Sequence, residues 1–593
     1  MMRLHDESGE AEQRACWTAG LAVFVASLLN FLFYNYNFGT DPHIVQVLPF
    51  IRRLNPGLSY PSDPYVETVR SFPSLYPQIM AFLSRHVALE PLHLFLYVLL
   101  RLAWFSAVYK LAARMFSGIG AASLACLLVA LSPLANVATP LGEDPMIKNS
   151  LYQTTLAAPL LLLSMCWFME MKYARSLGLL GAAFYLNGVV ASQAAFILGT
   201  AAVFSSRRRA MLKGWLLFCL MVIPWLVWRQ TAWGAGNNII DILRMWYPGH
   251  YFPSLWPSTK WLLILAKIPL LAFLFWRALP QSPGERMLRR WLAALTGLWL
   301  AGWFFADVWP VAIVVKAQLF RSDAIFCVLG LICGAQYVRT LVGRPGLRPV
   351  VLSALLISSL VEVGASVYSG SILFLVLAQE FRPSWLKAAA GLGLGLCFAN
   401  VLMSPGQPWW NLSQGLLFAL LLVSGDEAAF GQLLFRGRMA VAVFLGLSPL
   451  APAFAYRLSH PSLDALSVEE QNWRQAQLWA RDHTPVGAVF FVPLASQGFR
   501  VYSERSPVVE WTDAAAANWE PSFGQAWLDR ISDLQRAESL PPGDELSCLG
   551  AKYNAWYRIV RSPARFAGQA LYANKDFAVL AVARRPCPDG IKP

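Results

Sequence analysis

Long apolar runs recur along the first three quarters of the chain, separated by short polar connections. A run of about 18 residues or more is long enough to cross the ~30 Å hydrocarbon core of a bilayer as a helix. The runs are continuous rather than alternating, which favours helices over the strands of a membrane barrel. Spans are expected near residues 16–36, 91–114, 118–138, 151–170, 215–228, 261–276, 291–308, 324–342, 350–363, 365–377, 386–403, 412–423 and 439–456. Because several are short for a full crossing, we predict roughly 11 to 15 transmembrane helices.

One further apolar run, residues 177–204, is interrupted by Asn187, Ser192 and Gln193. Polar groups and irregular backbone at membrane depth are tolerated where they are buried in protein or line a cavity. The run therefore favours two short helices that meet at a polar pocket, with a single continuous span as the alternative.

The polar loop after the first span, residues 38–90, contains two short amphipathic pieces. Apolar residues recur with helical spacing in residues 44–51 and again in residues 74–83. Helices of this kind lie flat in the lipid–water interface with their apolar side toward the lipid. We expect both pieces to be interfacial helices.

The pattern changes after about residue 459 and no longer predicts spans. Helices are indicated at residues 466–483 and 522–534, strands at 488–492, 557–560 and 577–582, and weaker strands at Val501 and 507–511. The sequence thus predicts a membrane module at residues 1–458 and a small α/β domain at residues 459–593. The tail has no glycine-rich phosphate loop and no nucleophile elbow, so no catalysis is assigned to it.

Composition supports a membrane protein and sets its orientation. Of 593 residues, 56% are hydrophobic and only 14% are charged, whereas soluble proteins are about a quarter charged. The net charge of +14 comes from basic residues gathered in short loops, which mark the cytoplasmic side, so no nucleic-acid partner is expected. We predict a multi-pass membrane protein, with a cytoplasmic N-terminus and an extracytoplasmic C-terminal domain. Anionic lipid headgroups of the bilayer are the natural partner of this charge.

Nine cysteines are present, and their spacing matches no metal-binding pattern. Only Cys548 and Cys587 lie in the polar tail, where they could pair outside the cytoplasm. The histidines also lack zinc-type spacing. A divalent cation is expected only if Asp41 and either Glu143 or Asp144 converge; otherwise the metal content stays unknown.

Five acids fall in the first two predicted outer loops: Asp41, Asp63, Glu67, Glu143 and Asp144. Each alone could be a solvated loop carboxylate or a helix cap, and Asp63 before Pro64 also fits a turn. Asp41 is the strongest candidate for chemistry, because an acid at a membrane boundary is costly unless it is paired or functional. As a general base, it needs only hydrogen-bond reach to an acceptor hydroxyl.

Basic and aromatic residues lie near the same boundaries. Arg321 could clamp a phosphate in bidentate fashion, or it could anchor in headgroups, with Asp323 as a candidate partner. The loop at residues 230–260 contains Arg244, His250 and Tyr251 among several aromatic residues. These aromatics fit an interfacial belt or a platform for a sugar ring or lipid tail. His43 follows Asp41 closely and is a further candidate for substrate binding.

This arrangement resembles the GT-C superfamily of glycosyltransferases that use polyprenyl-phosphate sugars, such as protein mannosyltransferases and aminoarabinose transferases. The acid at the start of the first outer loop matches Asp41 in GTDPH, and the second-loop acid matches Glu143 or Asp144 in LGEDP. Where the family carries an acid pair after its first span, this chain has Asp41-Pro42. The tail stretch TPVGAVFFVPLASQGFRVYSERSPVVEW is similar to bacterial membrane proteins with a tail of unknown function, and this resemblance implies a location in the bacterial inner membrane.

The resemblance implies inverting transfer of a sugar from a polyprenyl-phosphate donor to a hydroxyl of an acceptor glycan, lipid or protein. Asp41 would act as the base, and Arg321 would hold the phosphate. A polysaccharide polymerase or ligase, which depends more on outer arginines, is one alternative. A non-enzymatic transporter of lipid-linked glycans is another, but it needs a polar path through the spans. The residues available for such a path, Arg101, Lys110, Glu362 and Asn400, are few and scattered.

Overall fold

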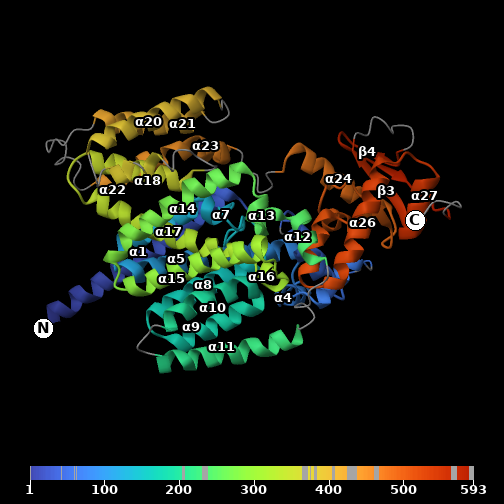
Figure 1. The fold of residues 1–593 in the computed structure, drawn as a ribbon, viewed down its shortest axis with the longest axis horizontal. Coiled ribbons are helices and arrows are strands. Elements are labelled where there is room, and N and C mark those ends of the chain that lie inside the picture. The colour runs from blue at the N-terminus through green and yellow to red at the C-terminus, as the bar shows by residue number, and fades with distance from the viewer. Residues whose placement is uncertain are drawn as a thin grey trace.

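The computed structural model consists of a helical bundle with a C-terminal α/β region at one end (Figure 1). Description is confined to residues 2–41, 43–58, 61, 63–203, 208–229, 238–362, 371–373, 375–378, 383–403, 408–423, 437–459, 466–561 and 570–586. We call the end of the bundle that carries the α/β region the domain end. The N-terminus lies at the opposite end of the molecule in this view.

The principal helices of the bundle follow the predicted spans closely. They are α1 (Met2–Tyr34), α5 (Leu89–Phe116), α6 (Ile119–Leu131), α8 (Gln153–Met169), α9 (Tyr173–Leu186), α10 (Gly188–Val203), α11 (Arg208–Trp228), α14 (Ser258–Ala278), α15 (Glu285–Trp303), α17 (Asp323–Val342), α18 (Arg348–Val361), α20 (Pro383–Met403), α21 (Pro408–Val423), α22 (Arg438–Leu447) and α23 (Ala451–Ser459). The expected span at 365–377 lies largely outside the described residues.

Within the described residues, seven helical stretches are long and apolar enough to cross a membrane, and six shorter apolar helices accompany them. The seven are Ala15–Tyr34, Leu89–Phe116, Arg209–Trp228, Ser258–Gln281, Glu285–Val308, Ala312–Val342 and Arg438–Arg457. The prediction of a polytopic helical membrane protein with a C-terminal α/β region is therefore confirmed.

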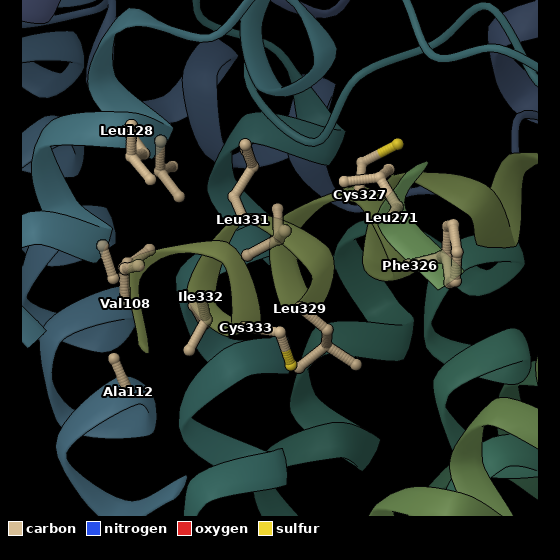
Figure 2. Packing of buried hydrophobic residues seen from close by; sticks show 14 of the residues in the cluster. Val108, Ala112, Leu128, Leu271, Phe326, Cys327, Leu329, Leu331, Ile332 and Cys333 are labelled. Carbon is tan, nitrogen blue, oxygen red and sulfur yellow. The ribbon is translucent and has the colours of Figure 1, made fainter. Parts of the chain in front are cut away.

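Helix α17 occupies the centre of the bundle. All but two of its 20 residues are buried, and it packs against α6, α14 and α18. Figure 2 shows Leu331 and Ile332 of α17 near Val108 of α5 and Leu128 of α6. A helix that is apolar on every side is stable only when surrounded by other helices or lipid, which explains its central position.

The interrupted run at 177–204 forms two helices, as the pattern favoured. Helix α9 ends at Leu186, and Asn187 adopts an extended conformation with φ −146° and ψ 98°. Its side-chain oxygen accepts hydrogen bonds from the backbone N–H groups of Val189 and Val190, at 3.2 and 3.4 Å. These bonds satisfy donors at the start of α10, which stabilises the break in an apolar setting.

The first loop contains η1 (His43–Val47), α2 (Leu48–Leu54), α3 (Pro64–Glu67), η2 (Thr68–Arg70) and α4 (Tyr76–Leu83). Helix α4 exposes Ile79 and Phe82, as an interfacial helix should. The expectation for residues 44–51 is wrong in one respect: the segment is helical, but Val47, Leu48 and Ile51 are fully buried. They pack with α4 and the α/β region, because tertiary contacts cover this apolar face instead of lipid.

Several short elements complete the domain end and the connections. They are α7 (Pro133–Asn136), α12 (Ile239–Trp246), α13 (Pro248–Tyr251), η4 (Pro253–Leu255), η5 (Leu279–Gln281), η6 (Phe304–Val308), α16 (Ala312–Lys316), η7 (Leu319–Ser322) and η9 (Ser448–Leu450).

The C-terminal α/β region, residues 466–586, is built on a five-stranded sheet of order β2-β1-β3-β5-β4. Its strands are β1 (Val489–Phe491), β2 (Ser506–Pro507), β3 (Ala555–Arg561), β4 (Tyr572–Ala573) and β5 (Phe577–Ala581). Strand β1 runs parallel to β2 and β3, whereas β5 runs antiparallel to β3 and β4. The helices are α24 (Val468–His483), α25 (Phe499–Ser503), η10 (Trp511–Asn518), α26 (Pro521–Ser539) and α27 (Asp544–Tyr553).

Most predicted elements of the tail are present, with one correction. Val501 lies in helix α25 rather than in a strand, because it packs with the buried face of residues 44–51. Of the second weak strand signal, residues 507–511, only Pro507 pairs in the sheet, as part of β2. Cys548 is disulfide-bonded, and Cys587 lies outside the described residues.

A shared apolar core joins the α/β region to the first loop. The rings of Phe50 and Phe72 pack edge-on against Trp519, with centroids 6.2 and 4.9 Å apart. The Trp519 indole N–H also donates to Thr68 Oγ1 at 3.1 Å. Aromatic pairs of this geometry add stability beyond their buried area, so the loop holds the α/β region firmly against the bundle.

Candidate functional site

A cavity of about 780 Å³ opens at the domain end, between the bundle, the loops and the α/β region. Its lining includes Asp41, Val45, Gln46, Phe72, Pro73, Ser74, Asp144, Lys148, Tyr152, Gln153, Phe184, Leu186, Asn187, Gly188, Val189, Ser192, Gln193, Phe196, Trp225, Trp246, Tyr247, His250, Tyr251, Leu298, Ile313, Lys316, Ala317, Gln318, Leu319, Arg321, Gln497, Trp511, Thr512, Ala515, Asn518 and Trp519. Its size is that of a small-molecule site.

Four charged side chains from three separate segments meet in this cavity. Lys148 Nζ lies 3.1 Å from Asp41 Oδ2 and 3.1 Å from Asp144 Oδ1. On its other side, Asp144 Oδ2 accepts a hydrogen bond from Arg321 Nη2. The cluster therefore runs Asp41, Lys148, Asp144, Arg321. The structure brings together three residues that the sequence marked as candidates and one, Lys148, that it did not.

The two carboxylates of the cluster differ in their surroundings. Asp144 is 8% exposed, whereas Asp41 is 62% exposed. Burial by itself raises the pKa of Asp144, but the charges of Arg321 and Lys148 outweigh it and hold that pKa well below its usual range. Burial likewise opposes the charge on Lys148, yet Asp144 and Asp41 raise its pKa well above the ordinary value. Asp144 is thus a fixed anion, and Asp41 is the carboxylate open to the cavity.

Arg321 is held in place by the loop that carries Glu143 and Asp144. A Cβ added to Gly142 would lie 2.7 Å from the Cα of Arg321, so only glycine permits this close approach. The carboxylate of Asp323 accepts hydrogen bonds from the backbone N–H groups of Leu141 and Gly142, at 2.6 and 3.0 Å. Asp323 therefore fixes this loop, and the expected Asp323–Arg321 pair is replaced by Asp144–Arg321.

The break between α9 and α10 contributes a polar face to the cavity, through Asn187, Ser192 and Gln193. Gln193 Nε2 donates to the backbone carbonyl of Gln318 at 2.8 Å, which ties α10 to the turn that carries Arg321. The oxygen of the same Gln193 amide has no hydrogen-bond partner among the described residues. The polar residues that interrupt this apolar run therefore line the cavity, and one of them, Gln193, also joins α10 to the neighbouring turn.

The aromatic loop supplies Trp246, Tyr247, His250 and Tyr251 to the lining. Burial, together with Arg321 and nearby lysines, lowers the pKa of His250 well below its usual value, so the ring is neutral near pH 7. Tyr251 accepts a hydrogen bond from Gln318 Nε2 at 2.8 Å, and burial raises its pKa to about 12. These side chains present neutral, partly polar surfaces to the cavity.

Two predicted site residues lie beside the cavity without lining it. Glu143 accepts a hydrogen bond from Lys260 Nζ at 2.9 Å and lies 4.0 Å from His250 Nδ1. His43 is fully buried; its Nδ1 accepts from the Gly39 N–H at 3.1 Å and its Nε2 lies 2.8 Å from the carbonyl of Leu151. Burial lowers the pKa of His43 to about 3. Both ring nitrogens are used internally, so His43 supports the fold.

The remaining predicted residues are also engaged elsewhere. Asp63 caps α3 and binds the guanidinium of Arg500 in the α/β region. Glu67 pairs with Arg53 at 2.8 Å, and the Arg244 guanidinium lies 5.2 Å from the centroid of the Phe252 ring. None of these three residues lines the cavity. Their sequence positions near the membrane boundary did not reveal which partners they would meet.

Sequence reasoning missed Lys148 and the contribution of the α/β region. Lys148 stands four residues after Asp144, a spacing that could have suggested an ion pair, but no helical pattern supported it. Six residues of the α/β region line the cavity: Gln497, Trp511, Thr512, Ala515, Asn518 and Trp519. In the sequence, their polar and aromatic side chains are those of any soluble domain.

No group of three or more histidine, cysteine or acidic side chains within the described residues is placed to hold a metal ion. Asp41 and Asp144 each lie 3.1 Å from the Nζ atom of Lys148. The ammonium group of Lys148 therefore bridges the two carboxylates.

Comparisons with known proteins give a family match in the α/β region and two structural similarities. Residues 471–534 match a family described as a domain of unknown function, DUF6798. No curated protein matches the chain. The crystal structure of ArnT from Cupriavidus metallidurans bound to undecaprenyl phosphate is similar over 95% of this chain and 97% of that chain, with 13% identity and a TM-score of 0.45.

The crystal structure of an Archaeoglobus fulgidus oligosaccharyltransferase in its apo form is similar over 91% of this chain and 69% of that chain, with 12% identity and a TM-score of 0.36. Similarities at this level carry no conclusion about the activity of this chain. The family match covers only part of the α/β region and none of the charged cluster.

Proposed function

We propose that this protein is a membrane glycosyltransferase that moves a sugar from a polyprenyl-phosphate donor to a hydroxyl group of an acceptor. The observation that carries the proposal is the meeting of Asp41, Lys148, Asp144 and Arg321 in one cavity at the domain end. Two cations beside an exposed carboxylate suit the transfer of a group that leaves as a phosphate anion.

Arg321 and Lys148 bind the donor phosphate. A guanidinium can hold two phosphate oxygens at once, and an ammonium adds a point charge. Asp144 touches both cations and orients them, and its low pKa keeps it charged over the whole physiological range. Negative charge develops on the phosphate as the bond to the sugar breaks, so these contacts strengthen in the transition state.

Asp41 acts as the general base. It removes a proton from the acceptor hydroxyl, whose oxygen attacks the anomeric carbon of the donor sugar. The bond from that carbon to the phosphate oxygen breaks, and the polyprenyl phosphate leaves with the bonding pair. Among the described residues, the carboxylate of Asp41 has one partner, Lys148. When Lys148 turns toward the phosphate, Asp41 is released to meet the acceptor.

The apolar part of the cavity suits a prenyl chain. Phe184 and Phe196 from the broken pair of helices and Trp225 from α11 line it, and Phe196 is 49% exposed. A lipid tail can therefore lie between these helices while its phosphate reaches the cluster. Charged groups alone would equally suit a soluble phosphate compound, and the apolar wall favours a lipid-borne donor.

The test is a transfer assay with the protein in vesicles and radiolabelled polyprenyl-phosphate sugars. Asp41→Asn is expected to lower transfer by about 10²- to 10⁴-fold, the usual contribution of a general base, while undecaprenyl phosphate still binds. Arg321→Met should weaken that binding. Asp241→Asn is the matched control, because Asp241 is an exposed acid of the aromatic loop outside the cavity. An Asp41→Asn protein with full activity refutes the assignment of the base.

The same pair of variants separates the two enzyme classes considered from the sequence. A transferase with a base loses more activity through Asp41→Asn than through Arg321→Met. A polymerase or ligase that depends on its arginine shows the reverse order.

A further inference from the structure

The cavity has two chemically different walls. The wall from the bundle and loops carries the charged cluster, whereas the six lining residues from the α/β region are all uncharged. Five of these six belong to η10 or follow it directly: Trp511, Thr512, Ala515, Asn518 and Trp519. We call the surface that these five residues form the η10 wall. A ligand part that meets this wall gains from hydrogen bonds and ring contacts rather than from charge.

Buried polar atoms of the η10 wall point to a polar ligand. Thr512 is 8% exposed and lines the cavity, and its hydroxyl has no hydrogen-bond partner among the described residues. The buried side-chain oxygen of Asn518 likewise has no hydrogen-bond partner among the described residues. Buried donors and acceptors are nearly always paired in folded proteins, because an unpaired group costs free energy. A hydroxyl-bearing ligand would satisfy both groups.

The shape of the wall suits a ring. Two indoles, those of Trp511 and Trp519, line the cavity together with Ala515, which is the smallest side chain in the wall. Aromatic side chains offer large flat apolar surfaces, and alanine takes up little space. A pyranose ring has apolar C–H faces and hydroxyl groups around its edge, and it matches this combination of indole, amide and hydroxyl groups.

The η10 wall is rigid and adjacent to Asp41. Glu510 and Asp513 form a capping box at the start of η10, and Arg500 binds both carboxylates at 2.7 and 2.8 Å. Helix η10 also packs against η1, which begins two residues after Asp41. A ring held on this wall therefore lies beside the carboxylate proposed as the base, whose partner Lys148 belongs to the proposed phosphate site.

We infer that the η10 wall is a binding subsite for the uncharged sugar ring of the acceptor, so that the acceptor is a glycan or glycolipid. This inference rests on the proposed function, because it identifies the acceptor class of the same cavity. Thr512 and Asn518 would hydrogen-bond ring hydroxyls, and Trp511 would cover one ring face.

The experiment measures binding of methyl β-glucoside, methyl α-mannoside, methyl β-galactoside and methyl β-N-acetylglucosaminide by saturation-transfer NMR. It uses the full-length protein in lipid nanodiscs without sugar-headed detergent. At least one glycoside should bind the wild-type protein. Thr512→Val and Asn518→Leu should each weaken it about three- to tenfold, the range for one lost neutral hydrogen bond. Tetrahydropyran, a ring without hydroxyls, should respond to neither variant.

Thr484→Val is the matched control. Thr484 belongs to the same region and is 8% exposed like Thr512, but its hydroxyl donates to the carbonyl of Ala480 and lies outside the cavity. Its variant should lose thermal stability and keep glycoside binding. Thr512→Val should keep its thermal stability, because no internal hydrogen bond is removed, and should bind the glycoside more weakly. Unchanged binding in both cavity variants, or no binding of any glycoside to the wild type, overturns the inference.

Transfer by the Asp41→Asn protein separates a failure of the sugar subsite from a failure of the proposed base. Glycoside binding that depends on Thr512, together with full activity of Asp41→Asn, leaves this subsite in place and refutes the proposed base. Loss of transfer in Asp41→Asn, without glycoside binding to the wild type, refutes the subsite alone.

Discussion

Replacing Arg500 by methionine removes the guanidinium that joins the α/β region to the first loop. Its five N–H groups make five hydrogen bonds of 2.7 to 3.2 Å to Asp63, Glu510 and Asp513. All four side chains are 1–2% exposed. The variant leaves three carboxylates buried together with no cation. Breaking one buried ion pair by removing a partner typically costs 3–5 kcal/mol, and we expect a loss of about 4 kcal/mol at pH 8.

The assay is thermal unfolding of the full-length protein in detergent, followed by fluorescence. For a folding unit of about 150–250 residues, 1 kcal/mol corresponds to roughly 2–4 °C in Tm. Arg500→Met should therefore unfold about 10 °C below the wild type. Arg536→Met is the control, because Arg536 pairs with Glu545 at 2.6 Å while both side chains are about 40% exposed. An exposed pair contributes at most about 1 kcal/mol, or a few degrees.

The pH dependence of the loss gives a second criterion. Burial already raises the pKa values of Glu510 and Asp513 in the intact protein. Without Arg500, the three carboxylates repel one another more strongly and bind protons more readily. The destabilisation should therefore shrink as the pH falls from 8 to 5. An Arg500→Met protein that unfolds within the range of Arg536→Met, or a loss that does not depend on pH, refutes this account of the cluster.

Three further predictions concern single side chains. Burial raises the pKa of Glu510 from 4.5 to about 7. Between pH 4.5 and pH 7 the folded protein therefore keeps a proton on Glu510 that the unfolded protein releases, so Glu510 stabilises the fold less as the pH rises. The Tm of Glu510→Gln should accordingly rise relative to that of the wild type between pH 5 and pH 8, and a constant difference in Tm contradicts this. Gly142→Ala should cost about 1–3 kcal/mol and reduce transfer, since its Cβ would meet the backbone of Arg321; unchanged Tm and activity would show that the loop can move. Trp519→Phe loses the hydrogen bond to the hydroxyl of Thr68, so its free energy of unfolding should fall by about 1 kcal/mol. An unchanged free energy of unfolding contradicts this prediction.

Some residues of the candidate site could be predicted from the sequence, and others could not. Asp41 is a candidate because a charged group near a membrane boundary is costly unless used. Asp144 is one because it matches the second-loop acid of the family that the chain resembles, and Arg321 because a guanidinium can clamp a phosphate. All three line the cavity, whereas His43 and Asp63, also candidates, contact Leu151 and Arg500. A boundary position predicts that a charge has a partner; it does not name the partner.

The sequence by itself determined the helices of the bundle, the break at Asn187 and most elements of the tail. These features depend on the period and length of apolar runs, which act locally and are imposed by lipid and water. Only the tertiary structure decided that residues 44–51 bury their apolar face, that Lys148 bridges two acids, and that η10 walls the cavity. Apart from the contacts of Asp144 with Lys148 and of residues 44–51 with α4, the residues in these contacts lie more than 100 positions apart in the chain. The contacts depend on how complementary surfaces pack rather than on any local pattern.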